Sequence, residues 1–562
     1  MNAHVSKQLL TFAVLVSVLL MVQKPVQNQI PIGKSGRSVV RAQHGMVASS
    51  QPLASQVGLE VLKQGGNAVD AAIAMAAVLN VTEPMMTGIG GDMFALVYWA
   101  KTKELKGLNA SGRAPRSWTL EHFTKKNLKQ MPARGMEAIT VPGAFDGWTT
   151  LLDRYGTMKL AQLLRPAIEY AENGFPVMEK TAQDWEAEVD VLQRTPASAE
   201  NYLVNGRAPR AGEIFRQANL ARTFRTLAEG GRDAFYKGPI ARSIVDYMRA
   251  NGGFITLEDL AATESEWVEP ISTNYRGYQV YEIPPNGQGI TALIALNILE
   301  GFDLAALRSH PAQYYHTLIE ATKLAFADRN RYIADPTVSK VPVAELLSKE
   351  YAAKRRALID PNKTLDNPPA GDINLGSDTT YFTVVDKDGN AVSFINSLFD
   401  AFGSGIVAGD TGILFQNRGT AFSLDPKHAN VVAPGKRPFH TIIPAMVFKD
   451  NQLFMSFGVM GGAIQPQGHV QVLVNLIDMK MGLQEAIDAP RYRITTGRNV
   501  LLEDELGSGT IDQLLKLGHI KAKPPGVLRS SMGGGQAIMI DPLSKTLMGA
   551  SDSRKDGLAL GY

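Results

Sequence analysis

Two hydroxyl residues, Thr379 and Ser397, stand at positions that a β-hairpin would bring together. Residues 380–396 are rich in β-branched and aromatic side chains on either side of the turn sequence DKDGN. A three-residue loop with Gly389 left-handed places Thr379 opposite Ser397, whereas a two-residue loop places Thr379 opposite Leu398. We favour the three-residue loop, which sets the two hydroxyls side by side on one face of the hairpin.

Thr379 also follows a segment that is suited to cleavage. Residues 360–378 are dense in Pro, Gly, Asn and Asp, which indicates a loop that leads into the strand. A threonine hydroxyl is a poor nucleophile, but a chain-terminal amine with a pKa of about 7.7 to 8 is a suitable base beside it. Cleavage before Thr379 would therefore create a nucleophile that carries its own base. On this segment alone, a plain edge hairpin that begins with Thr is the better explanation.

Motifs spread over most of the chain change that balance. They resemble landmarks of the γ-glutamyltranspeptidase family, in the family order. The motifs are GGDMF at 90–94, VPG at 141–143, PPNGQG at 284–289, TTYFT at 379–383, DGNAV at 388–392, FGSGI at 402–406, PGKRP at 434–438 and GG at 461–462. The resemblance implies an α+β fold of the N-terminal nucleophile hydrolase superfamily, a four-layer αββα sandwich. It also implies autoprocessing into a large subunit, residues 42–378, and a small subunit, residues 379–562, which stay together.

The resemblance assigns the parts that acyl transfer requires, which are a nucleophile, a base and donors for the oxyanion. Thr379 supplies the hydroxyl and, once freed by its own attack on the Asp378 carbonyl, the α-amine. Ser397 takes the place of a second hydroxyl that is usually Thr. Gly461 and Gly462 resemble the family's oxyanion hole, where two backbone N–H groups meet one oxygen.

The substrate-binding positions depart from the family pattern. An Asn, a Gln and an Asp that hold the amino side of a glutamyl group are here Phe399, Arg418 and Ala421. The Ser-Ser pair that helps to hold the α-carboxylate is His440-Thr441, and the carboxylate-binding Arg is shifted to Arg113, directly before Ala114. Arg113 and Arg418 would both suit a carboxylate. The pocket therefore favours an acyl group with a terminal carboxylate, glutamyl or glutaryl, over one that is read by its ammonium.

We predict a self-processing γ-glutamyl hydrolase/transferase that acts on γ-glutamyl amides such as glutathione. Water or an amine accepts the acyl group from Thr379, and transpeptidation is weak. One alternative is a glutaryl or cephalosporin-type acylase on the same scaffold, and another is a non-catalytic binding protein of this fold. A dehydrogenase is disfavoured: residues 287–292 fit G-x-G-x-x-A, but residues 309–312 lack the acidic residue that holds the ribose.

Composition narrows the remaining classes. The 562 residues carry a formal net charge of +3 without a long basic run, so no nucleic-acid partner is expected. There is no cysteine, and the nine histidines show no metal-ligand spacing. We therefore predict no metal and no cofactor.

The start of the chain predicts export. Residues 9–22 form an uncharged, mostly apolar run that is shorter than the roughly 18 to 20 residues of a spanning helix. We read residues 1–22 as a signal peptide or N-terminal anchor and residues 23–41 as a linker. The enzyme would be periplasmic or secreted, or held at the membrane by its N-terminus because no clear cleavage pattern follows the run.

Residue patterns also predict the main elements around these motifs. We expect helices from 52 to the glycines at 65–66 and over 67–79, strands at 93–99 and from 105, and mostly helices over 157–250. Further on we expect a strand at 278–283, a helix at 313–332 with an exposed Glu320/Lys323 face, a hairpin within 442–457, a helix at 470–479 and a strand pair within 536–550.

Overall fold

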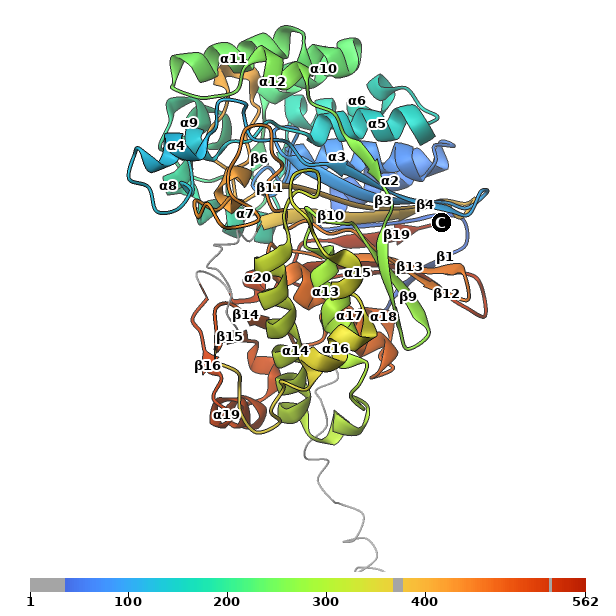
Figure 1. Ribbon diagram of the computed structural model, residues 1–562. Helices are drawn as coiled ribbons and strands as arrows, with labels where there is room; N and C mark the ends of the chain where they lie inside the picture. The colour runs from blue at the N-terminus through green and yellow to red at the C-terminus, as the bar shows by residue number, and fades with distance from the viewer. Residues whose placement is uncertain (1–35, 367–377, 525–527) are drawn as a thin grey trace, which may run out of the picture.

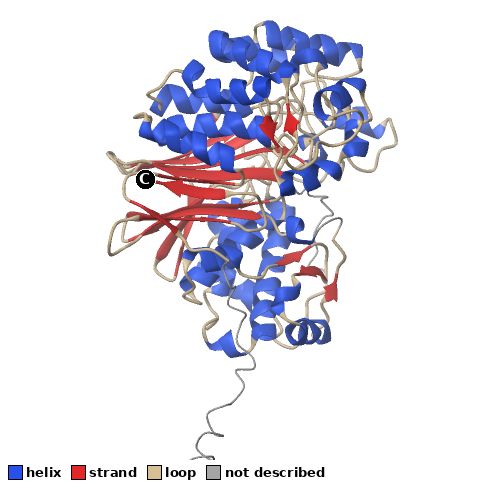
Figure 2. Cartoon of the chain, turned by 180° about the vertical axis from the view of Figure 1, so that it is seen from behind, coloured by secondary structure: helices blue, strands red, loops and turns tan. Residues whose placement is uncertain are grey.

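Two antiparallel sheets lie face to face between two layers of helices in the computed structural model, which describes residues 36–366, 378–524 and 528–562 (Figures 1 and 2). The leader predicted at 1–22 and most of the predicted linker lie outside these residues. Among the described residues, no helix is both long enough and apolar enough to cross a membrane.

We call the sheet that contains the predicted hairpin the hairpin sheet and the other the facing sheet. The hairpin sheet runs in the order β19 (Leu558–Gly561), β2 (Met46–Ser49), β10 (Asp378–Val385), β11 (Ala391–Phe399), β3 (Asp92–Trp99), β4 (Glu104–Ala110) and β7 (Glu266–Val268). The facing sheet runs in the order β1 (Val40–Ala42), β18 (Leu547–Ser551), β17 (Gly534–Ile540), β13 (Gln452–Met460), β12 (Ala445–Lys449), β9 (Tyr278–Glu282) and β8 (Ile271–Tyr275). Two smaller sheets are formed by β14 (Tyr492–Ile494), β15 (Asn499–Leu502) and β16 (Ile520–Lys521), and by β5 (Phe175–Pro176) and β6 (Ile214–Phe215).

Each helical layer covers the outer side of one sheet. The layer on the hairpin sheet comprises α2 (Pro52–Lys63), α3 (Ala68–Thr82), α5 (Ala144–Tyr155), α6 (Leu160–Asn173) and α10 (Ala218–Tyr236), with α4 (Leu120–Thr124), α7 (Glu179–Glu186), α8 (Val189–Leu192), α9 (Pro196–Tyr202), α11 (Pro239–Ala250) and α12 (Leu257–Ala261) around them. The layer on the facing sheet comprises α13 (Gly289–Leu299), α14 (Pro311–Tyr332), α17 (Ile464–Ile477) and α18 (Leu483–Asp488), with α15 (Val343–Leu346), α16 (Lys349–Arg356), α19 (Ser508–Lys516) and α20 (Leu528–Ser531). This arrangement confirms the predicted αββα sandwich.

Successive side chains of the hairpin strands pack alternately into two different hydrophobic cores. Phe382 and Val384 of β10 pack into the core beneath α3, whereas Tyr381 and Val385 pack into the core between the two sheets. Side chains of a strand alternate between its two faces, so Thr379 shares the face of Tyr381 and points toward the facing sheet.

The hairpin has the three-residue loop that the sequence favoured. Asp386 N donates to Asn390 O at 3.0 Å, and Gly389 has a φ of 82°. A left-handed φ is readily adopted by glycine, which explains why Gly389 stands at this position. The ladder then runs from Val385 opposite Ala391 to Thr380 opposite Asn396.

Both sheets mix strands from before and after Asp378. In the hairpin sheet β10 pairs with β2 and β11 pairs with β3, and in the facing sheet β12 pairs with β9 and β18 pairs with β1. Backbone hydrogen bonds therefore hold the predicted large and small subunits together in two sheets, whether or not the chain is cut between them.

Three expectations are corrected by the structure. The helix expected at 470–479 is α17, which already begins at Ile464. Glu320 and Lys323 are not exposed: their side chains are 0% and 2% exposed and form an ion pair at 3.0 Å. Strand β1 begins at Val40, so the linker is shorter at that end than residues 23–41.

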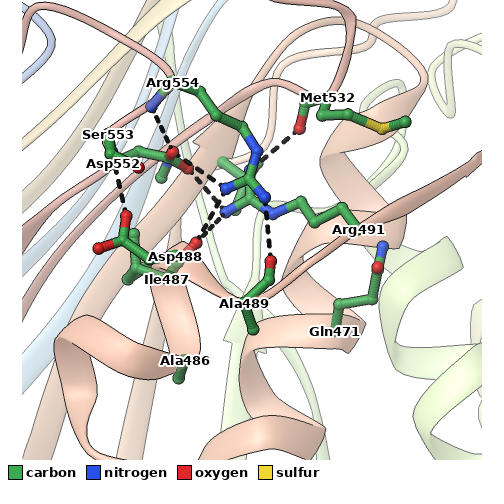
Figure 3. A network of polar contacts seen from close by, with 12 residues as sticks. Gln471, Ala486, Ile487, Asp488, Ala489, Arg491, Met532, Asp552, Ser553 and Arg554 are labelled. Atoms are coloured by element: carbon green, nitrogen blue, oxygen red, sulfur yellow. Dashed lines mark hydrogen bonds and ion pairs between the residues drawn. The ribbon is translucent and has the colours of Figure 1, made fainter. Parts of the chain in front are cut away.

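A buried charge network ties the C-terminal segment to the turn after α18 (Figure 3). Each carboxylate oxygen of Asp552 forms an ion pair, one with Arg491 at 2.8 Å and the other with Arg554 at 3.1 Å. Arg554 Nε also donates to Glu503 at 2.8 Å. Burial alone would raise the pKa of Asp552, but the two guanidinium groups lower it to about 2. The network is stable because each buried charge has an opposite charge beside it.

Substituting Asp552→Ala should destabilise the fold strongly, by about 3 to 5 kcal/mol, because two buried guanidinium groups lose a shared carboxylate. The free energy of unfolding in urea would measure the loss. Asp504→Ala is a matched control, since Asp504 pairs with Lys521 at the surface and its side chain is 80% exposed. Equal stability of the two variants would contradict this account of the network.

Candidate active site

The predicted hydroxyl pair meets at the open end of the hairpin. Thr379 Oγ1 and Ser397 Oγ lie 3.1 Å apart, and both side chains are buried between the sheets. Thr379 is the second residue of β10 and Ser397 lies near the end of β11. The structure thus brings together the two hydroxyls that the hairpin register predicted.

The hairpin ends in a bulge next to this pair. The register shifts between Asp378 and Thr380, so that Asp378 lies opposite Phe399. Phe399 has a φ of 83°, which is a rare backbone conformation for a bulky residue. Its N–H donates to Ser397 Oγ at 2.9 Å, so the bulge directs a backbone donor at the hydroxyl pair.

Arg418 is a charged group in direct contact with the pair. Its Nη2 donates to Ser397 Oγ at 3.2 Å and its Nη1 to Thr441 Oγ1 at 2.8 Å. The guanidinium lies 4.3 Å from the ring centre of Phe399 and is fully buried. Burial lowers the pKa of Arg418 to about 10, which leaves it charged at neutral pH.

These contacts orient the Ser397 hydroxyl. A hydroxyl oxygen has two acceptor lone pairs and one proton. The N–H of Phe399 and the guanidinium of Arg418 both donate to Ser397 Oγ, which also shares a hydrogen bond with Thr379 Oγ1.

Asp92, which the sequence analysis treated only as part of a glycine-rich landmark, connects the remaining polar residues. Its Oδ1 accepts from Gly112 N at 2.7 Å and from Gln416 Nε2 at 3.0 Å. Its Oδ2 accepts from His440 Nε2 at 2.9 Å and lies 3.7 Å from Arg418 Nε. Asp92 begins β3, directly opposite Ser397 on β11. The only signal in the sequence was its place in the GGDMF landmark, directly before the strand expected at 93–99.

His440, which contacts Asp92, is kept neutral mainly by its burial. Its Nε2 donates to Asp92, and its Nδ1 accepts from Ile442 N at 3.4 Å. Burial and the positive charge of Arg418 lower the pKa of His440 to about 4. At neutral pH His440 thus orients Asp92 and adds no positive charge to the pocket.

Arg113 lies farther from the pair than the sequence suggested. Its side chain is 40% exposed, and it donates to Gly435 O at 3.1 Å and lies 3.7 Å from Asp335. Burial and neighbouring Arg437 lower its pKa. Among the described residues Arg113 contacts neither Thr379 nor Arg418, although the adjacent Gly112 shares Asp92 with Arg418.

The glycine pair forms the turn between β13 and α17. Gly461 and Gly462 have φ values of 123° and 65°, and their carbonyls accept from the N–H groups of Ile464 at 3.4 Å and Gln465 at 3.2 Å. Within the described ranges, no acceptor is hydrogen-bonded to the N–H groups of Gly461 and Gly462. Two backbone donors of one turn are thus left for another acceptor.

Gln465 links this turn to the hydroxyl pair and was missed by the sequence analysis. Its Nε2 lies 3.5 Å from Thr379 Oγ1, and its Oε1 accepts from Ile443 N at 3.0 Å. The backbone donor at Oε1 fixes which end of the amide faces Thr379. No sequence pattern pointed to Gln465, because the helix was expected to begin only at 470.

The opposite face of β10 carries a buried carboxyl group. Glu83 Oε2 accepts from Thr380 Oγ1 at 2.9 Å and from Ser50 Oγ at 2.6 Å. Burial raises the pKa of Glu83 to about 7. Glu83 therefore holds the residue next to Thr379 from the helix side of the sheet.

One group of potential metal ligands occurs in the described part of the chain, away from this site. His316, Glu320 and His519 are buried with their ligand atoms within 4.8 Å of one another. Lys323 donates to Glu320 Oε1 at 3.0 Å, and the two histidine rings are hydrogen-bonded at 2.8 Å. These contacts are those of a self-contained polar cluster.

Comparisons with known proteins cover nearly the whole chain. The family model described as Gamma-glutamyltranspeptidase matches residues 54–562. The chain is 42% identical over 524 residues to the "Glutathione hydrolase-like YwrD proenzyme" of Bacillus subtilis (92% of this chain, 98% of the relative) and 38% identical over 553 residues to the "Glutathione hydrolase proenzyme" of Escherichia coli (93% of each). A solved structure of cephalosporin acylase from Bacillus halodurans superposes with a TM-score of 0.88 at 46% identity, covering 94% of this chain and 97% of that one.

The neutral state of His440 gives a prediction for acid stability. Its pKa is about 4 when folded and about 6.5 when unfolded, so the unfolded chain binds more protons between these values. The stability that depends on His440 is therefore present above pH 6.5 and is lost as the pH falls toward 4. His440→Gln keeps a donor for Asp92 but cannot gain a proton.

We expect the melting temperature of His440→Gln to fall less than that of the unsubstituted protein between pH 7 and pH 4, as measured by calorimetry. His44→Gln, at an exposed position, controls for the loss of a histidine. Parallel pH curves for all three proteins would show that His440 is not held neutral by this site.

Proposed function

The chain belongs to the γ-glutamyltranspeptidase family, and we propose that it is a self-processing enzyme that hydrolyses γ-glutamyl amides such as glutathione. The observation that carries the proposal is the 3.1 Å contact between Thr379 Oγ1 and Ser397 Oγ, directly after the Asp378–Thr379 bond. The predicted large subunit, 42–378, and small subunit, 379–562, are the two parts that self-processing would produce.

Self-processing begins with the Thr379 hydroxyl. Thr379 Oγ1 attacks the Asp378 carbonyl carbon, the peptide C–N bond breaks, and the acyl group passes to oxygen as an ester. Water then hydrolyses the ester, which leaves a carboxylate on Asp378 and a free amine on Thr379. The strand pairs between β10 and β2 and between β11 and β3 keep both pieces in one fold.

The same oxygen then attacks the substrate. The α-amine of Thr379 accepts the hydroxyl proton as Oγ1 bonds to the acyl carbon, and the protonated amine returns a proton to the departing amine. Ser397 Oγ at 3.1 Å and Gln465 Nε2 at 3.5 Å both contact Oγ1, which supports a role for these two side chains in orienting the nucleophile. Water hydrolyses the resulting ester and restores Thr379.

The glycine turn supplies the donors for the tetrahedral oxyanion. The N–H groups of Gly461 and Gly462 have no acceptor within the described ranges, and the next helical turn reaches Thr379 through Gln465. One such donor is worth about 3 kcal/mol of transition-state stabilisation. The turn is thus suited to bind the oxyanion that forms at Thr379.

Two arginines favour an acyl group that ends in a carboxylate. Arg418 is fully buried beside Thr441, and its Nε makes no hydrogen bond among the described residues. The side chain of Arg113 is 40% exposed, and the adjacent Gly112 donates to Asp92. The two guanidinium groups support the recognition of a glutamyl or glutaryl carboxylate, with Thr441 bound to Arg418 and His440 bound to Asp92.

A second candidate function is a glutaryl or cephalosporin-type acylase. The ring of Phe399 lies against Arg418 at 4.3 Å, and Ala421 follows in the same short helix, so neither position offers an acceptor for the ammonium of a glutamyl group. The similarity to a cephalosporin acylase agrees with this chemistry. The γ-glutamyl proposal rests on recognition of a carboxylate on the acyl group. Because glutamyl and glutaryl groups both carry that carboxylate, its recognition does not distinguish the two substrates.

Removing the nucleophile should stop both reactions. We expect mass spectrometry of the purified protein to give two pieces, the second beginning at Thr379, and Thr379→Ala to stay as one uncut chain without amidase activity. Thr379→Ser keeps a hydroxyl and should still be cut. An uncut chain in the unsubstituted protein would favour the binding-protein alternative.

The identity of residue 399 should set the choice between acyl groups. Phe399→Asn adds an acceptor for an ammonium and suits the left-handed φ of 83°. We expect it to raise the ratio of kcat/KM for γ-glutamyl anilide over glutaryl anilide about tenfold, the effect of about one hydrogen bond to a charged group.

Phe399→Leu removes the ring without adding an acceptor and is the matched control for this ratio. An equal change in the Leu variant would show that ring size, and not polarity, decides. If the unsubstituted protein cleaves glutaryl anilide far faster than γ-glutamyl anilide, the acylase proposal replaces the γ-glutamyl hydrolase proposal.

A further inference from the structure

A buried amide lies behind the glycine turn and is explained by none of the steps above. Gln288 precedes α13 within the PPNGQG motif, and its side chain is fully buried. Its Nε2 donates to Thr441 O at 2.7 Å and to Gly462 O at 2.9 Å. Its Oε1 accepts from Arg329 Nη1 at 2.9 Å.

Arg329 fixes the direction of that amide. A guanidinium can only donate, so the oxygen of Gln288 must face Arg329 and the NH2 group must face the two carbonyls. Both protons of the NH2 group are then used, one on each carbonyl. A single side chain therefore joins Thr441, which binds Arg418 through its hydroxyl, to Gly462 in the glycine turn.

The buried charge of Arg329 lowers the stability of the folded protein at this position. It is 4% exposed, its Nε donates to Asn330 Oδ1 at 2.9 Å, and it lies 4.2 Å and 5.6 Å from the ring centres of Phe326 and Phe439. Among the described residues no carboxylate forms an ion pair with Arg329, and burial lowers its pKa to about 9. A buried cation without a counter-ion costs stability, which favours a functional reason for it.

The turn needs such an external support. Gly461 and Gly462 have φ values of 123° and 65°, and glycine has the widest backbone freedom of any residue. The Gly462 carbonyl is held by two donors, Gln288 Nε2 at 2.9 Å and Gln465 N at 3.2 Å. The position of that carbonyl limits the rotation of the turn and therefore the direction of its N–H groups.

We propose that Gln288 and Arg329 are positioning residues, which hold the N–H groups of the glycine turn toward the oxyanion at Thr379. This inference rests on the proposed acyl transfer through Thr379. Arg329 acts through Gln288, and Gln288 acts through Gly462; neither touches the substrate. The geometry also assigns Gln288 a second effect. Because Gln288 binds the Thr441 carbonyl, it holds Thr441, and with it the contact to Arg418, at a set position relative to the turn.

The test compares variants of the full chain on an amide that the unsubstituted protein cleaves, with kcat expressed per mole of free N-terminal Thr379. Gln288→Ala should lower kcat about 30- to 300-fold with KM within about threefold, because the oxyanion interaction forms only in the transition state. Arg329→Lys keeps the positive charge but not the planar guanidinium, and its kcat should fall less than that of Arg329→Ala. Gln484→Ala removes another buried amide that donates to a backbone carbonyl, Ser551 O at 2.9 Å, and should keep kcat.

Two further variants separate positioning from stability. Gln288→Glu can form an ion pair with Arg329 through one oxygen but places its other oxygen, which cannot donate, at the two carbonyls. We expect the ion pair to keep its melting temperature near that of the unsubstituted protein, while kcat falls at least 30-fold. The double variant Gln288→Ala with Arg329→Ala should lose no more than Gln288→Ala alone, within about threefold, because Arg329 acts through Gln288.

Several outcomes would overturn the inference. Folded Gln288 variants with kcat within threefold of the unsubstituted protein would remove the positioning role. Single losses that multiply in the double variant would show that Arg329 does not act through Gln288. If the unsubstituted protein and these variants all cleave amides at similar rates, this inference alone is overturned. If the unsubstituted protein cleaves no amide, the proposed function is overturned and this inference with it.

Discussion

The register of the β10–β11 hairpin is the constraint on which the site depends. Side chains alternate with a period of two, so a slip of one residue would turn Thr379 from the facing sheet into the helix-side core. The loop at the far end sets this register. Gly389 accepts the left-handed turn, and buried Asp386 accepts from Ala68 N at 3.0 Å and from Asn390 N at 3.0 Å, which fixes the loop against α3. A contact at one end of the hairpin thus decides which hydroxyl meets Ser397 at the other.

Among the described residues, no carboxylate is hydrogen-bonded to the guanidinium beside the hydroxyl pair. Arg418 and Asp92 are both buried, and they lie 3.7 Å apart without a hydrogen bond between Arg418 Nε and the carboxylate. Asp92 is instead occupied by His440 and by backbone and amide donors, while the guanidinium faces Ser397, Thr441 and the ring of Phe399. The negative charge is therefore better neutralised by its neighbours than the positive one. A carboxylate on the acyl group would complete the balance, which agrees with the loss of acceptors for an ammonium.

The sequence predicted those parts of the site that local chemistry specifies. The turn sequence gave the hairpin register, and the glycines at 461–462 gave a turn before a helix, because turn residues and strand patterns act over a few positions. Asp92, Gln465 and Gln288 were missed, since their roles depend on partners that lie far away in the chain and on other elements. Glu320 was wrongly expected to be exposed for the same reason: its helix looked amphipathic, but the segment around Thr364 and Leu365 covers that face.

The position of Thr379 at the start of β10 follows from the way the two halves share the sheets. A cut in the middle of a strand would break ladder hydrogen bonds on both sides, whereas a cut before Thr379 leaves the pairs from Thr380 to Val385 with β11 intact. The connection through Asp378 contributes only loop-closure entropy, which grows slowly with loop length, while the interleaved strands bury the cores that hold the halves together. A residue at the start of an inner strand can therefore become a chain terminus. There it is rigid enough for chemistry, and its new amine can form without loss of the sheet.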